Sequence, residues 1–156
     1  MRTDSRLSRM LHVLLHMARE TDPVTSEQVA TMLGTNSAVV RRTMAGLREA
    51  GYVRSDKGRG GGWSFACRLQ DVTLFDIYRA IGIERIFAIG FDNQAPDCIV
   101  ERVVNASVSE AMRQAEAILI ERLSDLTLAD LSAQFQSALR GDENTFNHPA
   151  GAGNEP

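Results

Sequence analysis

The chain has 156 residues, of which 44% are hydrophobic and 24% are charged, so it can bury a compact core and is neither fibrous nor disordered as a whole. With 17 Lys and Arg against 20 Asp and Glu, its formal net charge is −3, which by itself argues against a nucleic-acid partner. Two distant cysteines, Cys67 and Cys98, make no disulfide framework, and without a secretory signal we expect a cytoplasmic protein.

The charges divide unevenly along the chain. Residues 1–68 hold eleven Lys or Arg and six Asp or Glu, a net charge of +5, which leaves −8 for the remainder. This asymmetry is typical of a basic half that binds nucleic acid, joined to an acidic half with another role. Two solvated faces that differ by chance are the alternative interpretation.

Two helices are predicted before residue 34. Residues 5–19 place apolar side chains at helical spacing, and Asp4 or Ser5 can cap the start of this helix. Thr25, followed three residues later by Gln28, forms a capping box that opens a short helix over 26–33. Gly34 then ends that helix.

A third helix is predicted to run to about Ala50, after only a few residues. Asn36 or Thr35 can cap its start, and Gly51 follows its end. Its inward face would carry Val40, Thr43, Met44 and Leu47. A short helix, a tight turn with glycine, and a second helix with arginines on its outer face are typical of a helix-turn-helix.

Residues 52–66 are predicted to form a β-hairpin with a glycine-rich tip. Lys57 and Arg59 stand among four glycines there, so two cations lie on a tip with little bulk, which suits contact with a phosphate backbone or a minor groove. A nucleotide-binding loop fits poorly, because Trp63 stands where G-x-G-x-x-G needs its last glycine and no helix follows. We therefore predict a wing with Trp63 packed onto the core.

Helices predominate in the second half. A capping box at 73–76 begins a helix through Ile81, residues 83–89 could form a strand or continue the packing, and 93–97 resemble a turn. A capping box at 127–130 begins a last helix to about Leu139. From residue 141 onward the composition predicts a disordered tail.

A long helix is predicted from about Ile99 to residue 123 or 124. It carries apolar residues at steps of three and four, a pattern that suits a dimer seam, with packing inside one chain as the alternative. The residues expected to form the dimer contact are Val104, Val108, Met112, Ala115 and Leu119.

The expected contacts with DNA come from the helix-turn-helix and the wing. The second helix of such a motif lies in the major groove, where Arg pairs with guanine and Asn with adenine. The arginines could instead only neutralise phosphates. The candidate residues are Asn36, Ser37, Val39, Arg41, Arg42, Lys57, Arg59, Gly60 and Gly61.

Catalytic and metal-binding patterns are weak. His12 and His16 lie four residues apart, as metal-binding pairs can, but the helix otherwise needs that face for packing and the spacing suggests no third ligand. We expect no metal site. No Ser-His-Asp set, Cys-His set or carboxylate pair stands at a recognisable spacing, so we predict that the chain is not an enzyme.

Four segments resemble the Rrf2 family of bacterial winged-helix regulators. They are the glycine-rich wing at 57–66, the segment Asp-Val-Thr-Leu and its helix at 71–81, Pro-Asp-Cys at 96–98 before a long helix, and the segment 126–131. The resemblance covers roughly residues 5–135. It implies a homodimer that holds two winged helices against a palindromic operator, usually as a repressor, with the long helices crossing at the interface.

The chain departs from the family's cluster-binding members. Those carry three closely spaced cysteines before the long helix, whereas here only Cys98 is present and Glu101 stands where some members have a histidine ligand. A cluster requires about four ligands, so we expect no iron–sulfur cluster and no other cofactor.

Cys98 leaves two interpretations open. A helix N-terminus would lower the pKa of its thiol and favour a reactive thiolate, whose oxidation could release DNA. Asp97 and Glu101 oppose that effect electrostatically. A buried and inert cysteine is the alternative, and Cys67 is expected to serve packing.

These observations predict a mainly α fold with a two-stranded wing. Residues 1–82 would form the winged helix-turn-helix domain, 83–140 a linker and helical dimerisation region, and 141–156 a disordered tail. The expected function is a sequence-specific, DNA-binding transcriptional regulator that responds to thiol oxidation or a small molecule. A winged-helix module that binds proteins is the alternative.

Overall fold

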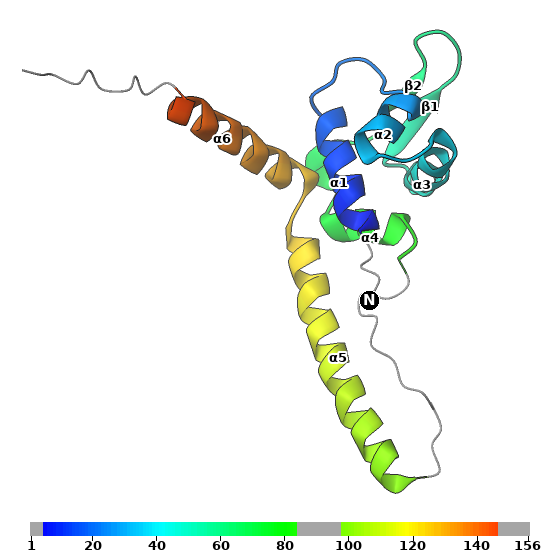
Figure 1. Ribbon diagram of the computed structural model, residues 1–156, viewed down its shortest axis with the longest axis vertical. Helices are drawn as coiled ribbons and strands as arrows, with labels where there is room; N and C mark the ends of the chain where they lie inside the picture. The colour runs from blue at the N-terminus through cyan, green and yellow to red at the C-terminus, as the bar shows by residue number, and fades with distance from the viewer. Residues whose placement is uncertain (1–4, 84–97, 147–156) are drawn as a thin grey trace, which may run out of the picture.

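The computed structural model describes residues 5–83 and 98–146. Its elements are α1 (Arg6–Met17), α2 (Ser26–Leu33), α3 (Ser37–Glu49), β1 (Val53–Asp56), β2 (Gly62–Phe65), the short 3-10 helix η1 (Leu69–Asp71), α4 (Leu74–Ala80), α5 (Ile99–Asp125) and α6 (Leu128–Phe146). Figure 1 shows a compact group of α1–α4 and the hairpin, from which α5 and α6 extend. The predicted fold class, a mainly α chain with a winged helix-turn-helix and a long helix, is confirmed.

One apolar core holds the winged part together. Helix α1 buries Met10, Val13, Leu14 and Met17, a spacing of three and four residues that lines a single helical face. Helix α3 buries Val40, Met44 and Leu47 against them, as predicted, while Thr43 is only half-buried. Fully burying a side chain of this size stabilises the fold by about 1.5–3 kcal/mol, so this core fixes the helix-turn-helix.

Two capping boxes, one at the start of α4 and one at the start of α6, lie where the C-terminal end of α5 meets the winged part. At Thr73 and at Thr127 the hydroxyl accepts from the backbone N–H three residues on, and the aspartate there accepts from the threonine N–H. An isolated bridge joins the two threonines: the N–H of Leu74 donates to the Leu126 carbonyl at 2.8 Å, and that of Leu128 to the Val72 carbonyl at 2.9 Å. We call this pair of helix starts the threonine junction.

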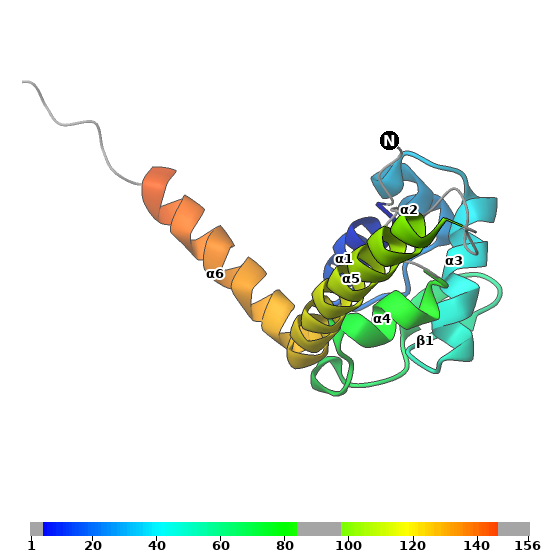
Figure 2. The ribbon, with the colours of Figure 1, turned by 90° about the horizontal axis from the view of Figure 1, so that it is seen from below.

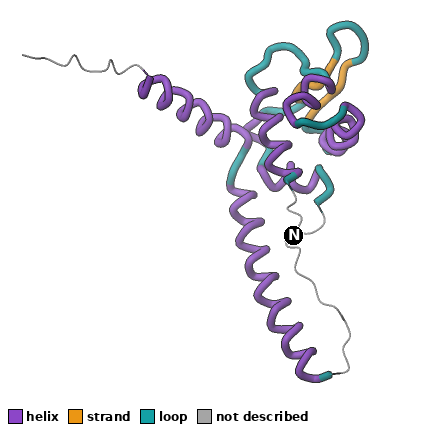
Figure 3. The backbone as a smooth tube through the Cα atoms, viewed as in Figure 1, coloured by secondary structure: helices purple, strands orange, loops and turns teal. Residues whose placement is uncertain are grey.

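The long helix has a different environment. Its 27 residues include no buried side chain, although Leu123, near its C-terminal end, is partly buried against the core. Figures 2 and 3 show α5 and α6 leaving the winged part in different directions, and α5 contacts α4. In α6, Leu128 is part of the core and Leu131 packs against it, and the helix also contacts α1 and η1.

Several predicted boundaries shift. Helix α6 continues to Phe146, past the expected end at Leu139, so residues 141–146 are helical and the predicted tail at 141–156 was wrong for them. The single Gly141 lowers the stability of the helix but does not end it, because the good helix formers Ala138, Leu139 and Arg140 come directly before it. Ser5 occupies the cap of α1, but its side chain makes no capping hydrogen bond. The predictions for 84–89 and 93–97 fall outside the described residues.

Candidate nucleic-acid interface

Local sequence determines the geometry of the helix-turn-helix. The predicted capping box is confirmed: the N–H of Gln28 donates to the Thr25 hydroxyl at 3.2 Å, and the Thr25 N–H donates to the Gln28 side chain at 2.8 Å. Gly34 ends α2 in the left-handed region at φ 58°, where a side chain is disfavoured. The turn to α3 is therefore tight.

The outer face of α3 is free for contact. Arg41 and Arg42 are exposed, Val39 is 40% exposed and Ser37 is half-buried at the first turn. Val39, Arg41 and Arg42 lie off the core face formed by the buried residues of α3, whereas Ser37, three residues before Val40, lies at its edge. This is the arrangement that lets the N-terminal half of a recognition helix meet base edges.

Asn36 has a structural role that limits its predicted one. Its Oδ1 accepts the backbone N–H of Val39 at 3.0 Å and so caps α3. A bidentate pair with adenine needs that same oxygen together with the amide nitrogen. While the cap is kept, Oδ1 has one lone pair left for DNA, and the side chain keeps the direction that the cap sets.

Arg41 is paired across the motif. Its guanidinium lies 3.3 Å from the Glu27 carboxylate of α2, and both side chains are more than half exposed. Such a surface pair contributes little to stability. For the predicted contact with DNA, Arg41 would have to exchange Glu27 for a base or a phosphate.

The wing forms as predicted. Strands β1 and β2 pair antiparallel, from Val53 opposite Phe65 to Asp56 opposite Gly62, and the tip between them exposes Lys57 and Arg59. Figure 3 shows the tip projecting from the winged part. The cations are thus carried away from the core, where they can reach a neighbouring polyanion.

Two glycines of the tip are required by its geometry. Gly60 adopts φ 79°, which L side chains rarely adopt. At Gly61 a Cβ atom would lie 2.3 Å from the Asp56 carbonyl oxygen. These glycines shape the hairpin; their predicted contact with DNA could only be through the backbone.

Trp63 fixes the wing to the helix-turn-helix. It is 6% exposed, as predicted, and its Nε1–H donates to the Ser26 hydroxyl of α2 at 3.0 Å. Its backbone N–H also donates to the Val24 carbonyl at 2.8 Å, and the Val24 N–H donates to the Trp63 carbonyl at 2.9 Å. Sequence reasoning missed Val24, because a single paired residue has no periodicity to reveal it. Wing and α2 are therefore held in one orientation.

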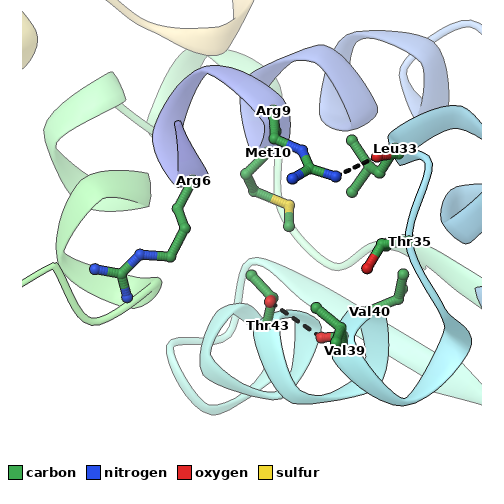
Figure 4. A pocket seen from close by; sticks show the side chains of 8 residues that line it. All are labelled: Arg6, Arg9, Met10, Leu33, Thr35, Val39, Val40 and Thr43. Atoms are coloured by element: carbon green, nitrogen blue, oxygen red, sulfur yellow. Dashed lines mark hydrogen bonds between the residues drawn. The ribbon is translucent and has the colours of Figure 1, made fainter. Parts of the chain in front are cut away.

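A cavity of about 60 Å³ lies behind the start of α3 (Figure 4). Its lining is Arg6, Arg9, Met10, Leu33, Thr35, Val39, Val40 and Thr43. The Arg9 guanidinium donates to the Leu33 carbonyl at the end of α2. Arg9 was not among the predicted site residues, yet it ties α1 to the turn that positions α3.

The predicted dimer residues lie on an unburied face of α5. Val104 and Val108 are 52% and 36% exposed, Ala115 is exposed, and Met112 and Leu119 are half-buried. Val100, four residues before Val104, extends this apolar surface toward the start of the helix, and Ile99 and Val103 are exposed on its other sides. Intrachain packing, the alternative for this stripe, therefore covers it only in part.

Comparison with known proteins agrees with this geometry. The sequence model of Rrf2, described as an iron-dependent transcriptional regulator, matches residues 3–134. The chain belongs to the Rrf2 family. Among relatives is YwnA of Bacillus subtilis, which is described as an HTH-type transcriptional regulator. It is 28% identical over 129 residues, which are 82% of this chain and 95% of YwnA.

Solved structures show the same fold. A transcriptional regulator from Lactobacillus plantarum has a TM-score of 0.70 at 21% identity, covering 90% of this chain and 98% of that one. T. potens IscR has a TM-score of 0.60 at 24% identity, covering 88% and 90%. The chain is thus an Rrf2-type transcriptional regulator with a DNA-binding fold, in a class of proteins that are not enzymes. Across residues 5–83 and 98–146, no helix combines the length and apolarity needed to cross a membrane.

The family description mentions iron, but the described residues of this Rrf2 protein do not fit an iron site. They contain no group of three or more His, Cys, Asp or Glu that could hold a metal ion. The chain's two cysteines lie on different elements, Cys67 after β2 and Cys98 at the start of α5. A cluster needs about four ligands, mostly thiolates.

The two thiols have opposite environments. Cys98 is exposed at the N-cap of α5, and although its side chain makes no capping hydrogen bond, the nearby backbone N–H groups of Glu101 and Val100 lower the pKa of its thiol. Cys67 is partly buried, and burial, with the nearby Asp71 carboxylate, raises the pKa of its thiol. Its Sγ lies 3.4 Å from the Tyr52 carbonyl, which agrees with the predicted packing role. The expectation that Cys98 could be buried was wrong.

Proposed function

We propose that this Rrf2 protein is a cytoplasmic, homodimeric repressor that binds a palindromic operator through two winged helices. One observation carries the proposal: α5 presents an apolar stripe that its own chain leaves largely exposed. Large exposed apolar surfaces mark interaction sites in soluble proteins. A second copy of α5 supplies a matching stripe, and a two-fold axis between the copies covers both.

The charge distribution supports the orientation of such a dimer. Contact through α5 brings together the halves of net charge −8, and leaves the two halves of net charge +5 free to face one DNA duplex. The two α3 helices would then enter successive major grooves about 34–36 Å apart. Occupied in this way, a promoter is blocked to polymerase.

A selection experiment tests specific binding. The purified full chain is mixed with random duplex DNA, and the recovered fragments are sequenced. We expect a palindrome whose half-site centres lie about 10 base pairs, or a multiple of this, apart. Recovery of fragments without any enriched motif would contradict the proposal and favour a winged-helix module that binds proteins.

Salt titration tests the wing. Lys57→Ala and Arg59→Ala should each weaken binding to all sequences and reduce the slope of log affinity against log salt by about one unit. Arg140→Ala, which removes an exposed arginine of α6, is the matched control and should leave the slope unchanged. A wild-type slope in both wing variants would exclude the wing from the contact.

Repeating the selection with variants of α3 tests base reading. Arg41→Ala and Arg42→Ala should each relax the preferred base at one position of each half-site, since a good bidentate pair discriminates by about 1–3 kcal/mol. An unchanged consensus would assign these arginines to phosphates. Ser37 and Val39 are expected to contact the neighbouring bases.

We propose the Cys98 thiolate as the trigger for release. Its sulfur attacks the O–O bond of a peroxide, so the thiolate is oxidised to a sulfenic acid while the peroxide is reduced to water. The exposed helix N-terminus favours this reaction. Mild peroxide should abolish binding in the parent and in Cys67→Ser but not in Cys98→Ser; equal loss in all three would exclude the thiol and favour a small-molecule effector.

We propose that this function needs no iron–sulfur cluster. The support is the ligand set, because the whole chain has two cysteines and three histidines. Protein purified without oxygen should contain no stoichiometric iron and no visible absorption from iron–thiolate bonds. Stoichiometric iron with full operator affinity only in the iron-loaded form would contradict this.

A further inference from the structure

His12 and His16 face one another on α1. Their Nε2 atoms lie 3.0 Å apart, and the ring centroids lie 4.8 Å apart with 66° between the planes. His12 is exposed and His16 is half-buried, so this helix face is not used for packing as sequence analysis expected. The two imidazoles thus share one N–H···N hydrogen bond that solvent can reach, and an ion that replaced its proton would be bound by both nitrogens.

The pair borders an open groove between α1 and α6. The groove has a volume of about 410 Å³, and its other lining residues are Ser8, Leu11, Leu15, Leu131 and Phe135. Among these, Ser8 is the polar residue. The Arg19 guanidinium lies over the Phe135 ring at 5.3 Å, at the end of the groove beyond His16. The groove therefore supplies the histidine nitrogens with room for a hydrated ion and with few competing hydrogen-bond partners.

We propose that His12 and His16 form a two-nitrogen chelate for a divalent copper or nickel ion. Imidazole nitrogen suits the later first-row metals, and spacing of two histidines by four residues places both on one helical face. Among the described residues no third His, Cys, Asp or Glu joins them, so water occupies the remaining coordination positions.

The general preference of nitrogen ligands for Cu²⁺ over Ni²⁺ and Zn²⁺ gives the expected order of affinity, and the distance between the nitrogens is compatible with it. With metal–nitrogen bonds of about 2.05 Å, a separation of 3.0 Å gives an angle of about 94° at the metal. Square-planar and octahedral ions prefer a right angle, whereas a tetrahedral zinc ion would need the nitrogens about 3.3 Å apart. We therefore expect affinity in the order Cu²⁺, Ni²⁺, Zn²⁺, with no binding of Mg²⁺.

The ion would act on α1 and leave the DNA contacts untouched. It links two successive turns of a helix that packs against α2, α4 and α6. Because the chelate exists only when α1 is folded, binding adds to the free energy of unfolding. The chelate is independent of the proposed operator binding, so either proposal can fail alone.

The test uses untagged, full-length protein from which metal has first been removed with a chelator. This protein is titrated separately with CuSO₄, NiCl₂, ZnCl₂ and MgCl₂. We expect one Cu²⁺ per chain, an electron paramagnetic resonance spectrum with hyperfine splitting from two nitrogens, and a rise in Tm that increases with free metal. A spectrum without nitrogen splitting, or equal affinity for Mg²⁺, would overturn the proposal.

Matched variants locate the site. His12→Gln and His16→Gln should each lower Cu²⁺ affinity by about tenfold or more, since even loss of an outer-shell partner costs 10–100-fold. His148→Gln removes the chain's remaining histidine and should leave affinity and the spectrum unchanged. Circular dichroism confirms that each variant is folded. Wild-type affinity in the double variant His12→Gln/His16→Gln would overturn the assignment, as would a loss in His148→Gln of the same size.

Discussion

The winged part and the α5–α6 part of this Rrf2 protein use apolar residues in opposite ways. In the winged part Val13, Met44, Leu47 and Ile77 are completely covered by their own chain. In α5, Ile99, Val100 and Val103 are more than 60% exposed. The comparison shows that the winged part buries its apolar residues within its own chain, whereas the exposed apolar residues of α5 are the basis for the proposed dimer contact. Four substitutions, from the largest expected effect to the smallest, test this difference.

Val104→Asp should have the largest effect, because it changes the exposed stripe of α5 and leaves the core of the winged part intact. A carboxylate in the seam would prevent association, so light scattering should show a monomer. Operator affinity should fall by about 10²–10⁴-fold, because the second half-site contact is no longer intramolecular. The matched control is Ala106→Asp, which places the same charge on the opposite face of α5, where the residue is also exposed. Loss of dimer in both variants would show that the stripe is not the seam.

Leu47→Ala should have its main effect inside the winged part. The side chain is fully buried in α3, so the free energy of unfolding should fall by about 2–5 kcal/mol in urea titrations. The same substitution at the exposed Leu139 of α6 should change it by less than about 0.5 kcal/mol. Similar losses at both positions would remove the distinction between a packed and an unpacked part.

Glu27→Gln should strengthen operator binding. The substitution removes the carboxylate that holds Arg41, an exposed pair of a kind that contributes about 0.2–1 kcal/mol, so affinity should rise by about twofold to fivefold. Glu49→Gln, at the exposed far end of α3, is the control for a general change of charge and should raise affinity less. Equal gains from both variants in fluorescence anisotropy would count against a specific role for the pair.

Asp130→Asn should give the smallest change, at the threonine junction. Hydrogen bonds from Thr127 lower the pKa of the Asp130 carboxyl, so folding favours its charged form. This stabilisation is present above the unfolded pKa of about 3.9 and is lost as pH falls through the lower folded pKa. The variant should thus be less stable than the parent at pH 7, with the difference shrinking at acid pH. An unchanged difference across that range, with Glu121→Gln as control, would refute the linkage.

Local signals in the sequence predicted most of the fold. The boxes at Thr25, Thr73 and Thr127 each need only two residues three apart, and all three formed as expected. The glycine tip was equally readable, because few residues other than glycine adopt a positive φ. Such features depend on neighbours in the chain, which the sequence displays.

What remained unpredicted depends on contacts between distant residues. The pairing of Val24 with Trp63 and the bond from Arg9 to the Leu33 carbonyl join segments that lie 24 or more positions apart. The pairing of Arg41 with Glu27, which limits the predicted base contact, is likewise set by how α2 and α3 pack. Asn36 was assigned to bases because capping and recognition favour the same residue type.

In the proposed dimer, the threonine junction would determine how accurately the two DNA-binding domains are spaced. Helix α5 is 27 residues long, or about 40 Å, and its C-terminal end meets the winged part beside the bridge between Thr73 and Thr127. A tilt of about 5° at that pivot displaces the far end of the rod by about 3.5 Å, roughly one base-pair step of DNA. In the proposed dimer, the two backbone hydrogen bonds that join Leu74 to Leu126 and Leu128 to Val72 would therefore influence the distance between the two half-sites of the operator.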